Sequence, residues 1–323
     1  MKAALYRAYG PAAESLRVED VDPPEPGPGE VRVRMQLSGV NPTDWKSRSG
    51  ATPRPIDGFQ VPHHDGAGVI DAVGVGVDAG RLGQRVWTWL AAAGNRWGTA
   101  AQWSVLPAGR AVPLPAGATP ELGASLGVPA LTAHRALFAD GPVDGKNVLV
   151  AGGAGAVGHY AIELAKFFGA RVATTVSGRA KAELARKAGA DLVVNYRDAD
   201  AADQLRAFAA QMDRIVELAL GANLDLDLAV SGPDTYIVDY AAEATDPVLP
   251  VRRCMNANVT IRFMLLYSIP TEAIEHAVAD ISRAAAAGAL TELPLTRFPL
   301  EQVASAHNAV ELGAVGKVLV EIP

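Results

Sequence analysis

The chain has 323 residues, of which 49% are hydrophobic and 20% are charged, and its formal net charge is -6. This length favours two domains, and the negative charge gives no electrostatic reason to expect nucleic acid or an anionic membrane as partner. The single cysteine, Cys254, excludes an intrachain disulfide and a cysteine-rich zinc site. The sequence has no apolar run of about 18 residues, and Arg7 interrupts the segment that a signal peptide needs, so we expect a cytoplasmic location.

Three regions follow one another along the chain. Residues 1–125 contain short β-type runs such as "EVRVRMQLSGV" and "QRVWTWL", separated by turn clusters such as "DPPEPGPGE", and predict an all-β barrel or sandwich. Residues 126–258 alternate apolar strands with amphipathic helices, beginning with "NVLVAG", and predict a parallel sheet covered on both faces. Residues 259–323 contain the strand-like "NVTIRFMLLY", helices at about 271–287 and 300–312, and a final strand "KVLVEI" that we expect to rejoin the first region.

The most informative motif is "AGGAGAVG", which lies between the strand "NVLV" and an amphipathic helix. A GxGxxG pattern in this context is typical of a dinucleotide-binding turn, because glycines let the backbone approach a pyrophosphate and the helix N-terminus stabilises its charge. The predicted contacts come from one run of residues: Gly152, Gly153, Gly155, Ala156, Val157 and Gly158. A glycine-rich turn without a ligand is the alternative.

The second strand of this region predicts which dinucleotide binds. It ends "TTVSGRAK", which places Ser177, Arg179 and Lys181 where an NAD-binding protein would carry a carboxylate for the ribose hydroxyls. A hydroxyl and two cations match a 2′-phosphate, so NADPH is favoured over NADH. Solvated charges that merely open a helix are the alternative.

The stretch "VPHHDGAG" raises the question of a metal, since His63, His64 and Asp65 are all donor types that zinc accepts. A catalytic zinc needs about three converging protein ligands, which adjacent residues rarely supply. The alternative is that these residues are polar loop residues lining a pocket.

The order of the three regions resembles the medium-chain dehydrogenase/reductase superfamily, and over nearly the whole length its zinc-free, zeta-crystallin-like quinone oxidoreductase branch. The segment "SGVNPTD" is the most telling, because zinc alcohol dehydrogenases carry a cysteine ligand in this turn. His64 and Asp65 match the His and Glu of their Gly-His-Glu motif, while the partner cysteines have no match, so no metal is expected. The resemblance implies a Rossmann doubly wound parallel sheet (126–258, NADPH-binding) and a GroES-like β-barrel catalytic domain (1–125, completed by 259–323).

The resemblance also implies site residues. Substrate contacts are expected from Asn41, Trp45, His64 and Asp65, with His64 and Thr52 as candidate catalytic groups. Thr52 stands where relatives often have a tyrosine. Further cofactor contacts are implied for Asn41, Thr132, Ser177, Arg179, Lys181, Tyr196, Tyr240 and Ala241. Trp87, Trp89 and Trp97 either stack on a planar acceptor or pack in the β domain.

The implied function is zinc-independent, NADPH-dependent hydride transfer to quinones or α,β-unsaturated carbonyls, small molecules whose oxygen gains charge as hydride arrives. Three rivals stay open: a zinc alcohol dehydrogenase with metal at His64, an enoyl-thioester reductase, and a non-catalytic NADPH-binding crystallin-like protein. Thr52 in place of the tyrosine keeps the last of these open. The resemblance further implies a homodimer, which "NVTIRFMLLY" could extend by edge pairing.

Overall fold

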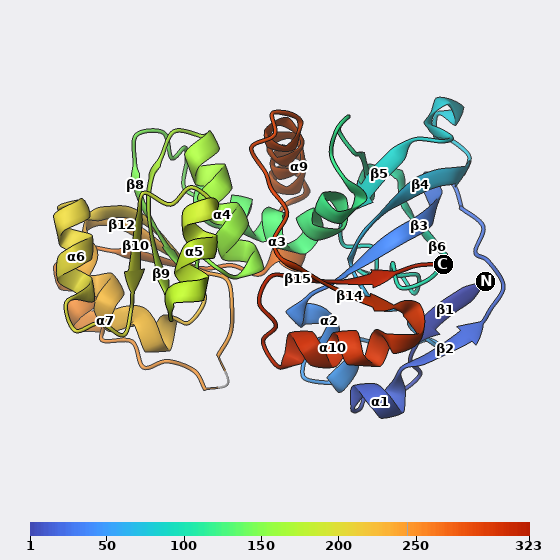
Figure 1. Cartoon of the computed structure of the whole chain (residues 1–323), viewed down its shortest axis with the longest axis horizontal. Coiled ribbons are helices and arrows are strands. Elements are labelled where there is room, and N and C mark those ends of the chain that lie inside the picture. Colours follow the sequence, from blue (N-terminus) through green and yellow to red (C-terminus); the bar gives the residue numbers. More distant parts are fainter. Residues whose placement is uncertain (244) are drawn as a thin grey trace. The chain divides into compact units, whose positions relative to one another are not determined.

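A computed structural model of the protein describes residues 1–243 and 245–323. The chain forms two compact units: unit 1 consists of Met1–Val128 and Glu292–Pro323, and unit 2 consists of Pro129–Thr291 (Figure 1). Within the described residues, no helix is long and apolar enough to cross a membrane. The C-terminal return to unit 1 therefore begins at Glu292, which corrects the expected return at residue 259.

Unit 1 is built on a sheet whose central strand is β3 (Glu30–Val40). β4 pairs along most of one edge of β3, whereas the other edge is divided between β6 and the C-terminal β15. The sheet path is β14-β15-β3-β4-β5-β7, and β1 pairs with β2 separately. The other strands of unit 1 are β1 (Lys2–Leu5), β2 (Arg17–Asp20), β4 (Asp65–Val73), β5 (Arg85–Thr88), β6 (Trp103–Pro107), β7 (Ala111–Pro113), β14 (Leu295–Pro299) and β15 (Lys317–Glu321).

The final strand behaves as the sequence predicts. β15 pairs antiparallel with the C-terminal half of β3, so Val318 lies opposite Val40 and Glu321 lies opposite Leu37. The apolar side chains of β15 are buried in the unit 1 core, and this burial stabilises the pairing of β15 with a strand distant in sequence. This pairing brings Lys317, near the end of the chain, next to residues that precede position 70.

Unit 1 also contains helices, which corrects the expectation of an all-β region. α2 (Pro42–Ser49) begins with Pro42 at its first position, follows an Asn41 cap and ends at Gly50 in the left-handed conformation, all ordinary helix boundary signals. The other helices are α1 (Ala12–Ser15), α10 (Val303–Glu311) and the short turns η1 (Ala79–Arg81), η2 (Ala108–Arg110) and η4 (Leu300–Gln302). α3 (Pro120–Phe138) starts in unit 1 and continues into unit 2.

Unit 2 is a parallel six-stranded sheet in the order β10-β9-β8-β11-β12-β13, as the alternating strands and helices predict. The strands are β8 (Asn147–Ala151), β9 (Arg171–Val176), β10 (Leu192–Asn195), β11 (Met212–Glu217), β12 (Ser231–Asp239) and β13 (Thr260–Phe263). The helices are α4 (Ala156–Phe167), α5 (Arg179–Lys187), α6 (Ala201–Phe208), α7 (Leu220–Val230), α8 (Val251–Ala257) and α9 (Thr271–Ala286), with the turn η3 (Leu266–Ser268). The doubly wound sheet is confirmed.

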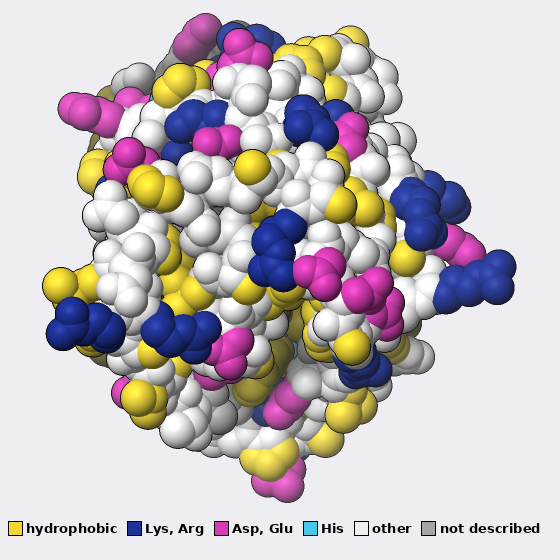
Figure 2. Space-filling view, turned by 90° about the vertical axis from the view of Figure 1, so that its left-hand side faces the viewer, with side chains coloured by type: hydrophobic (Ala, Val, Ile, Leu, Met, Phe, Trp, Pro, Cys, Tyr) yellow, Lys and Arg dark blue, Asp and Glu magenta, His cyan; other side chains and the backbone are white. Residues whose placement is uncertain are grey.

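The strand order reverses between β8 and β11, where open α/β sheets bind ligands at the carboxyl ends of their strands. The predicted domain boundary at residue 258 fails here because β13 pairs with β12 and extends this sheet instead of returning to unit 1. The face containing α6 and α7 carries interspersed acidic, basic and apolar side chains (Figure 2). Such a mixture does not form a single basic surface.

Candidate active site

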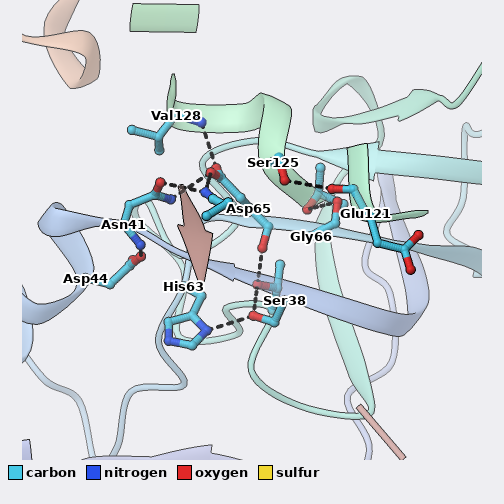
Figure 3. A network of polar contacts seen from close by, with 12 residues as sticks. Ser38, Asn41, Asp44, His63, Asp65, Gly66, Glu121, Ser125 and Val128 are labelled. Atoms are coloured by element: carbon cyan, nitrogen blue, oxygen red, sulfur yellow. Dashed lines mark hydrogen bonds and ion pairs between the residues drawn. The ribbon is translucent and has the colours of Figure 1, made fainter. Parts of the chain in front are cut away.

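In unit 1, a buried polar network joins the end of β3, the start of β4 and the start of β15 (Figure 3). Asn41 donates from Nδ2 to Asp65 Oδ2 at 2.7 Å. Lys317 Nζ donates to Asn41 Oδ1 at 2.8 Å and to Asp65 Oδ2 at 3.1 Å. All three side chains are at most 2% exposed. Each bond fixes the next, so the orientation of the Asn41 amide is set from both sides.

The other oxygen of Asp65 is held by the middle of α3. Val128 N–H donates to Asp65 Oδ1 at 2.7 Å. Gly127 allows this approach, because a Cβ at that position would stand 2.0 Å from the same oxygen. Asp65 therefore uses both carboxylate oxygens within the protein, and its charge faces the Lys317 ammonium in a buried ion pair.

The His63 side chain links Ser38 on β3 to His307 on α10. Its Nδ1 lies 2.7 Å from Ser38 Oγ and its Nε2 lies 2.9 Å from His307 Nε2. His63 has a φ of 78°, in the region that favours glycine. Burial, then His307, lowers the pKa of His63 well below its ordinary value, and burial lowers the pKa of His307 to about 3. Both rings are neutral at neutral pH.

His64, a predicted catalytic residue, lines a small polar cavity of about 20 Å³ in unit 1. Burial, helped by Arg54 and Arg110, lowers its pKa to about 3. At neutral pH His64 is thus an uncharged imidazole, able to relay a hydrogen bond but not to act as a cationic acid. The predicted transfer of a proton from His64 to a reduced acceptor therefore needs another proton source.

Asp44 lines the same cavity and was not predicted from the sequence. Its Oδ2 accepts a hydrogen bond from the Asn41 N–H at 2.7 Å, which caps α2. Burial first, and the nearby Asp65 second, raise the pKa of Asp44 to about 8. Its carboxyl group therefore carries a proton at neutral pH.

The remaining predicted residues of unit 1 lie on or just after α2. Trp45 is half-buried, with the Lys46 ammonium 5.9 Å from its ring centre. Thr52 is exposed, and its Oγ1 lies 3.5 Å from Ser47 Oγ. Trp87 and Trp89 are at most 8% exposed, which favours their reading as packed core residues.

In unit 2, the glycine-rich turn lies at the carboxyl end of β8. Gly152 has a φ of 69°, Gly155 caps α4, and Gly155 N–H bonds back to the Gly152 carbonyl at 2.9 Å. Ala156, Val157 and Gly158 open the helix, where backbone N–H groups have no acceptor within the helix. A Cβ at Gly155 would meet only one atom within 4 Å, at 3.4 Å, so the turn has open space beside these donors. The turn therefore fits a dinucleotide phosphate.

The predicted 2′-phosphate contacts gather where β9 and β10 end. Tyr196 N–H donates to the Val176 carbonyl at 3.2 Å, which brings Tyr196 beside the segment that holds Ser177. Ser177 is half-buried, whereas Arg179 and Lys181 at the start of α5 are exposed. Arg179 lies 3.6 Å from Glu183 one turn along the helix.

The other predicted contacts of unit 2 differ in their surroundings. Thr132 is buried on α3, and Tyr240 and Ala241 directly follow β12. Burial raises the pKa of Tyr240, so its hydroxyl keeps its proton. Next to it, at the ends of β11 and β12, lie Glu217 and Asp239, which the sequence reading missed; burial raises the pKa of both, that of Asp239 to about 6.

Comparison with known proteins follows the same division of the chain. Residues 27–116 match the model of the alcohol dehydrogenase GroES-like domain, and residues 156–283 match that of the zinc-binding dehydrogenase. Human quinone oxidoreductase is 29% identical over 320 residues, covering 98% of this chain and 95% of that protein. The chloroplastic quinone-oxidoreductase homolog of Spinacia oleracea is 32% identical over 231 residues, 68% of this chain and 69% of the homolog.

The chain belongs to the quinone oxidoreductase branch of the medium-chain dehydrogenase/reductase superfamily. It is an oxidoreductase of the medium-chain reductase type.

Solved structures of this superfamily share the fold. A mycobacterial protein solved in complex with NADPH is 30% identical, with a TM-score of 0.85 over 99% of this chain and 100% of that one. An NAD-dependent alcohol dehydrogenase is 27% identical, with a TM-score of 0.90 over all of both chains. The GroES-like and Rossmann assignments are thereby confirmed. One of these neighbours is solved with NADPH, and the other is named an NAD-dependent enzyme.

Proposed function

We propose that the protein is a zinc-independent, NADPH-dependent reductase that transfers hydride to quinones or related α,β-unsaturated carbonyls. The proposal is carried by one arrangement, the glycine-rich turn before α4 followed at the next strand end by Ser177, Arg179 and Lys181. A hydroxyl and two cations suit a 2′-phosphate, and a carboxylate at this place would suit a 2′-hydroxyl. NADPH bound to the mycobacterial relative and the names of the quinone oxidoreductase relatives support the proposal.

Zinc independence is supported by what the candidate donors already bind. Both ring nitrogens of His63 have partners in Ser38 and His307, and both oxygens of Asp65 have partners, one of them the Lys317 ammonium. The Lys317 ammonium already neutralises the negative charge of Asp65, which would otherwise attract a metal ion. Cys254, the one cysteine, lies on α8 of unit 2, away in sequence from this network.

Bound NADPH would supply the hydride. The protein has to hold the cofactor and to stabilise oxygen as it gains charge. The turn at residues 152–158 would hold the pyrophosphate, and the network of Lys317, Asp65 and Asn41 keeps Asn41, the predicted nicotinamide ribose contact, in one orientation. The buried Lys317 ammonium adds a fixed positive charge beside Asn41.

The decisive experiment measures NADPH oxidation with a panel of quinones, alkenals and enoyl thioesters, with NADH as a parallel cofactor. We expect turnover with quinones or alkenals and a preference for NADPH. Turnover restricted to enoyl thioesters would instead identify an enoyl-thioester reductase, and cofactor binding without oxidation by any acceptor would identify a non-catalytic protein.

The zinc alcohol dehydrogenase alternative is separated by elemental analysis of protein purified without a histidine tag. We expect far less than one zinc per chain, and unchanged NADPH oxidation after dialysis against a chelator. Stoichiometric zinc whose removal abolishes turnover would contradict zinc independence. The predicted cytoplasmic location stays a prediction.

We further propose a homodimer formed through the free edge of β13. Around this edge Met255, Phe263 and Leu265 are each more than 60% exposed, which is unusual for large apolar side chains in one small region. Light scattering is expected to give the mass of two chains, and Phe263→Asp to lower it. Leu312→Asp, at an exposed apolar side chain in unit 1, is the matched control and is expected to leave the mass unchanged.

A further inference from the structure

The cavity in unit 1 that holds His64 and Asp44 is small and polar. Its volume of about 20 Å³ accommodates a water molecule, which needs roughly 10–15 Å³ and two to four polar partners. Polar side chains supply such partners on several sides: Tyr6, Asp44, Ser47, Arg54, Gln60 and His64. The cavity is therefore suited to an ordered water that contacts titratable groups.

Asp44 is the acidic group of this cavity. Its side chain is 4% exposed, and its Oδ2 accepts a hydrogen bond from the backbone N–H of Asn41. The nearby Asp65 raises the pKa of Asp44, whereas the cations of Lys317 and Arg54 lower it. Asp44 in turn raises the pKa of the Tyr6 phenol. Burial outweighs the two cations and raises the pKa of Asp44 to about 8, so a proton is present near neutral pH and is releasable.

A path of hydroxyl groups connects this cavity to the protein surface. Ser47 lines the cavity together with Asp44. Its Oγ lies 3.5 Å from Oγ1 of Thr52, which is exposed. Hydroxyl groups both donate and accept hydrogen bonds, so they pass protons without becoming charged themselves. Thr52 was predicted as a catalytic group, and this geometry gives it a place at the entrance of the path.

We propose that Asp44 is the proton store of the reductase, delivering its proton through the cavity water and recovering it from solvent along Ser47 and Thr52. This inference rests on the proposed function. Hydride, with its two electrons, leaves the reduced nicotinamide and reduces the acceptor, whose oxygen becomes negative. The Asp44 O–H bond then breaks as an O–H bond forms on the cavity water, which gives up a proton towards the acceptor oxygen. A proton from solvent restores the Asp44 carboxyl group.

The first test needs neither cofactor nor substrate. Infrared spectroscopy of the cofactor-free protein is expected to show the carbonyl band of a protonated carboxylic acid that disappears as pH rises through about 8. The part of the band that titrates near pH 8 should be missing in Asp44→Asn, whose amide oxygen still accepts the Asn41 N–H. It should remain in Asp78→Asn, a matched control in which the carboxylate also accepts a backbone N–H, from Gly80, on the surface of unit 1. Burial also raises the pKa of Glu217, Asp227 and Asp239 in unit 2, so the test is the part of the band that Asp44→Asn removes. The same band intensity and the same titration near pH 8 in both proteins would overturn the proposal.

The second test follows turnover. Asp44→Asn is expected to lower kcat about 100-fold at neutral pH, with little change in the KM for NADPH, and to abolish the decline of kcat above about pH 8. Asp78→Asn should keep both properties of the unmodified enzyme. An equal loss in which the pH profile keeps its shape would assign Asp44 to capping α2 alone and would refute its role as a store.

Thr52→Val keeps Asp44 and its cap in place, so it tests the path even if Asp44→Asn folds poorly. Its kcat is expected to fall several-fold and to recover when a small weak acid is added to the buffer. A fall without such recovery would contradict the path. If the unmodified protein fails to oxidise NADPH with every acceptor of the panel, the proposed function fails. The infrared titration still decides whether Asp44 stores a proton.

Discussion

The two units build their candidate sites by different means. In unit 2 the candidate site is a turn of seven consecutive residues, 152–158, which offers backbone N–H groups and open space at Gly155 to a phosphate. In unit 1 it is a set of buried side chains that are distant in sequence: Asn41 and Lys317 are 276 positions apart, and His63 and His307 are 244 apart. A backbone site does not titrate, whereas a side-chain network responds to pH and to the loss of any one member.

The largest effect is expected from Lys317→Met, which tests whether unit 1 depends on its buried ion pair. Removal of the ammonium leaves the Asp65 carboxylate buried without its charge partner, and we expect unfolding free energy to fall by about 3–5 kcal/mol. Urea unfolding measures the loss. Lys187→Met, at an exposed lysine on α5, is the matched control and should change stability by less than about 0.5 kcal/mol. Equal effects of the two substitutions would mean that the ion pair adds no stability.

The corresponding test in unit 2 compares two glycines of one turn. A Cβ at Gly158 would stand 2.4 Å from the Gly152 carbonyl oxygen, so Gly158→Ala must displace the backbone. We expect this substitution to lower the free energy of unfolding by about 3 kcal/mol and to abolish NADPH binding. Gly155→Ala meets its nearest atom at 3.4 Å and should leave urea unfolding almost unchanged while weakening NADPH binding, measured by fluorescence titration. If both variants bound NADPH normally, the turn would not be the dinucleotide site.

A third prediction uses the pH response of the buried histidine His307 in unit 1. Because the pKa of His307 is lowered to about 3 in the folded state, the unfolded chain binds more protons below about pH 6.5, and stability falls as pH decreases from there towards 3. At about pH 5 this loss is roughly 2 kcal/mol for one histidine. His307→Gln should remove it, as seen by urea unfolding across this pH range. His276→Gln, at an exposed side chain, should keep the unmodified profile, and an unchanged acid loss in His307→Gln would exclude this residue as the cause.

The smallest effect is expected at the exposed edge of unit 2. Lys181→Ala should raise the KM for NADPH by roughly fivefold, equivalent to about 1 kcal/mol for a solvent-screened charge, without changing the KM for NADH. Lys187→Ala removes an exposed lysine from the other end of the same helix and is expected to change neither constant. A matching rise with both cofactors would show that Lys181 does not distinguish the 2′-phosphate.

Local patterns predicted most of unit 2 because its elements are determined over short stretches. The strand before "AGGAGAVG", the helix after it and the alternation that follows all lie where periodicity and glycine place them. The prediction failed at β13, since a short strand carries no signal that says which sheet it will join. α2 was missed even though Asn41, Pro42 and Gly50 mark its ends, because the surrounding β-type runs dominated the interpretation.

In unit 1 the sequence identified Asn41, His64 and Asp65 through a resemblance, but not the residues that decide their chemistry. Asp44 carries no local signal of its role, because its raised pKa arises from burial and the nearby Asp65. Lys317 and His307 carry no local motif at all. Their roles come from pairing of β15 with β3 and packing of α10 beside His63.

The sequence by itself determined the parallel sheet, the glycine turn and the family to which the chain belongs, since those depend on residues close together in the chain. Tertiary structure alone decided that Asp65 faces an ammonium group, that His63, His64 and His307 stay neutral, and that Asp44 keeps a proton. The physical reason is that a charge state depends on burial and on neighbouring charges. Here those neighbours are brought together from opposite ends of the chain.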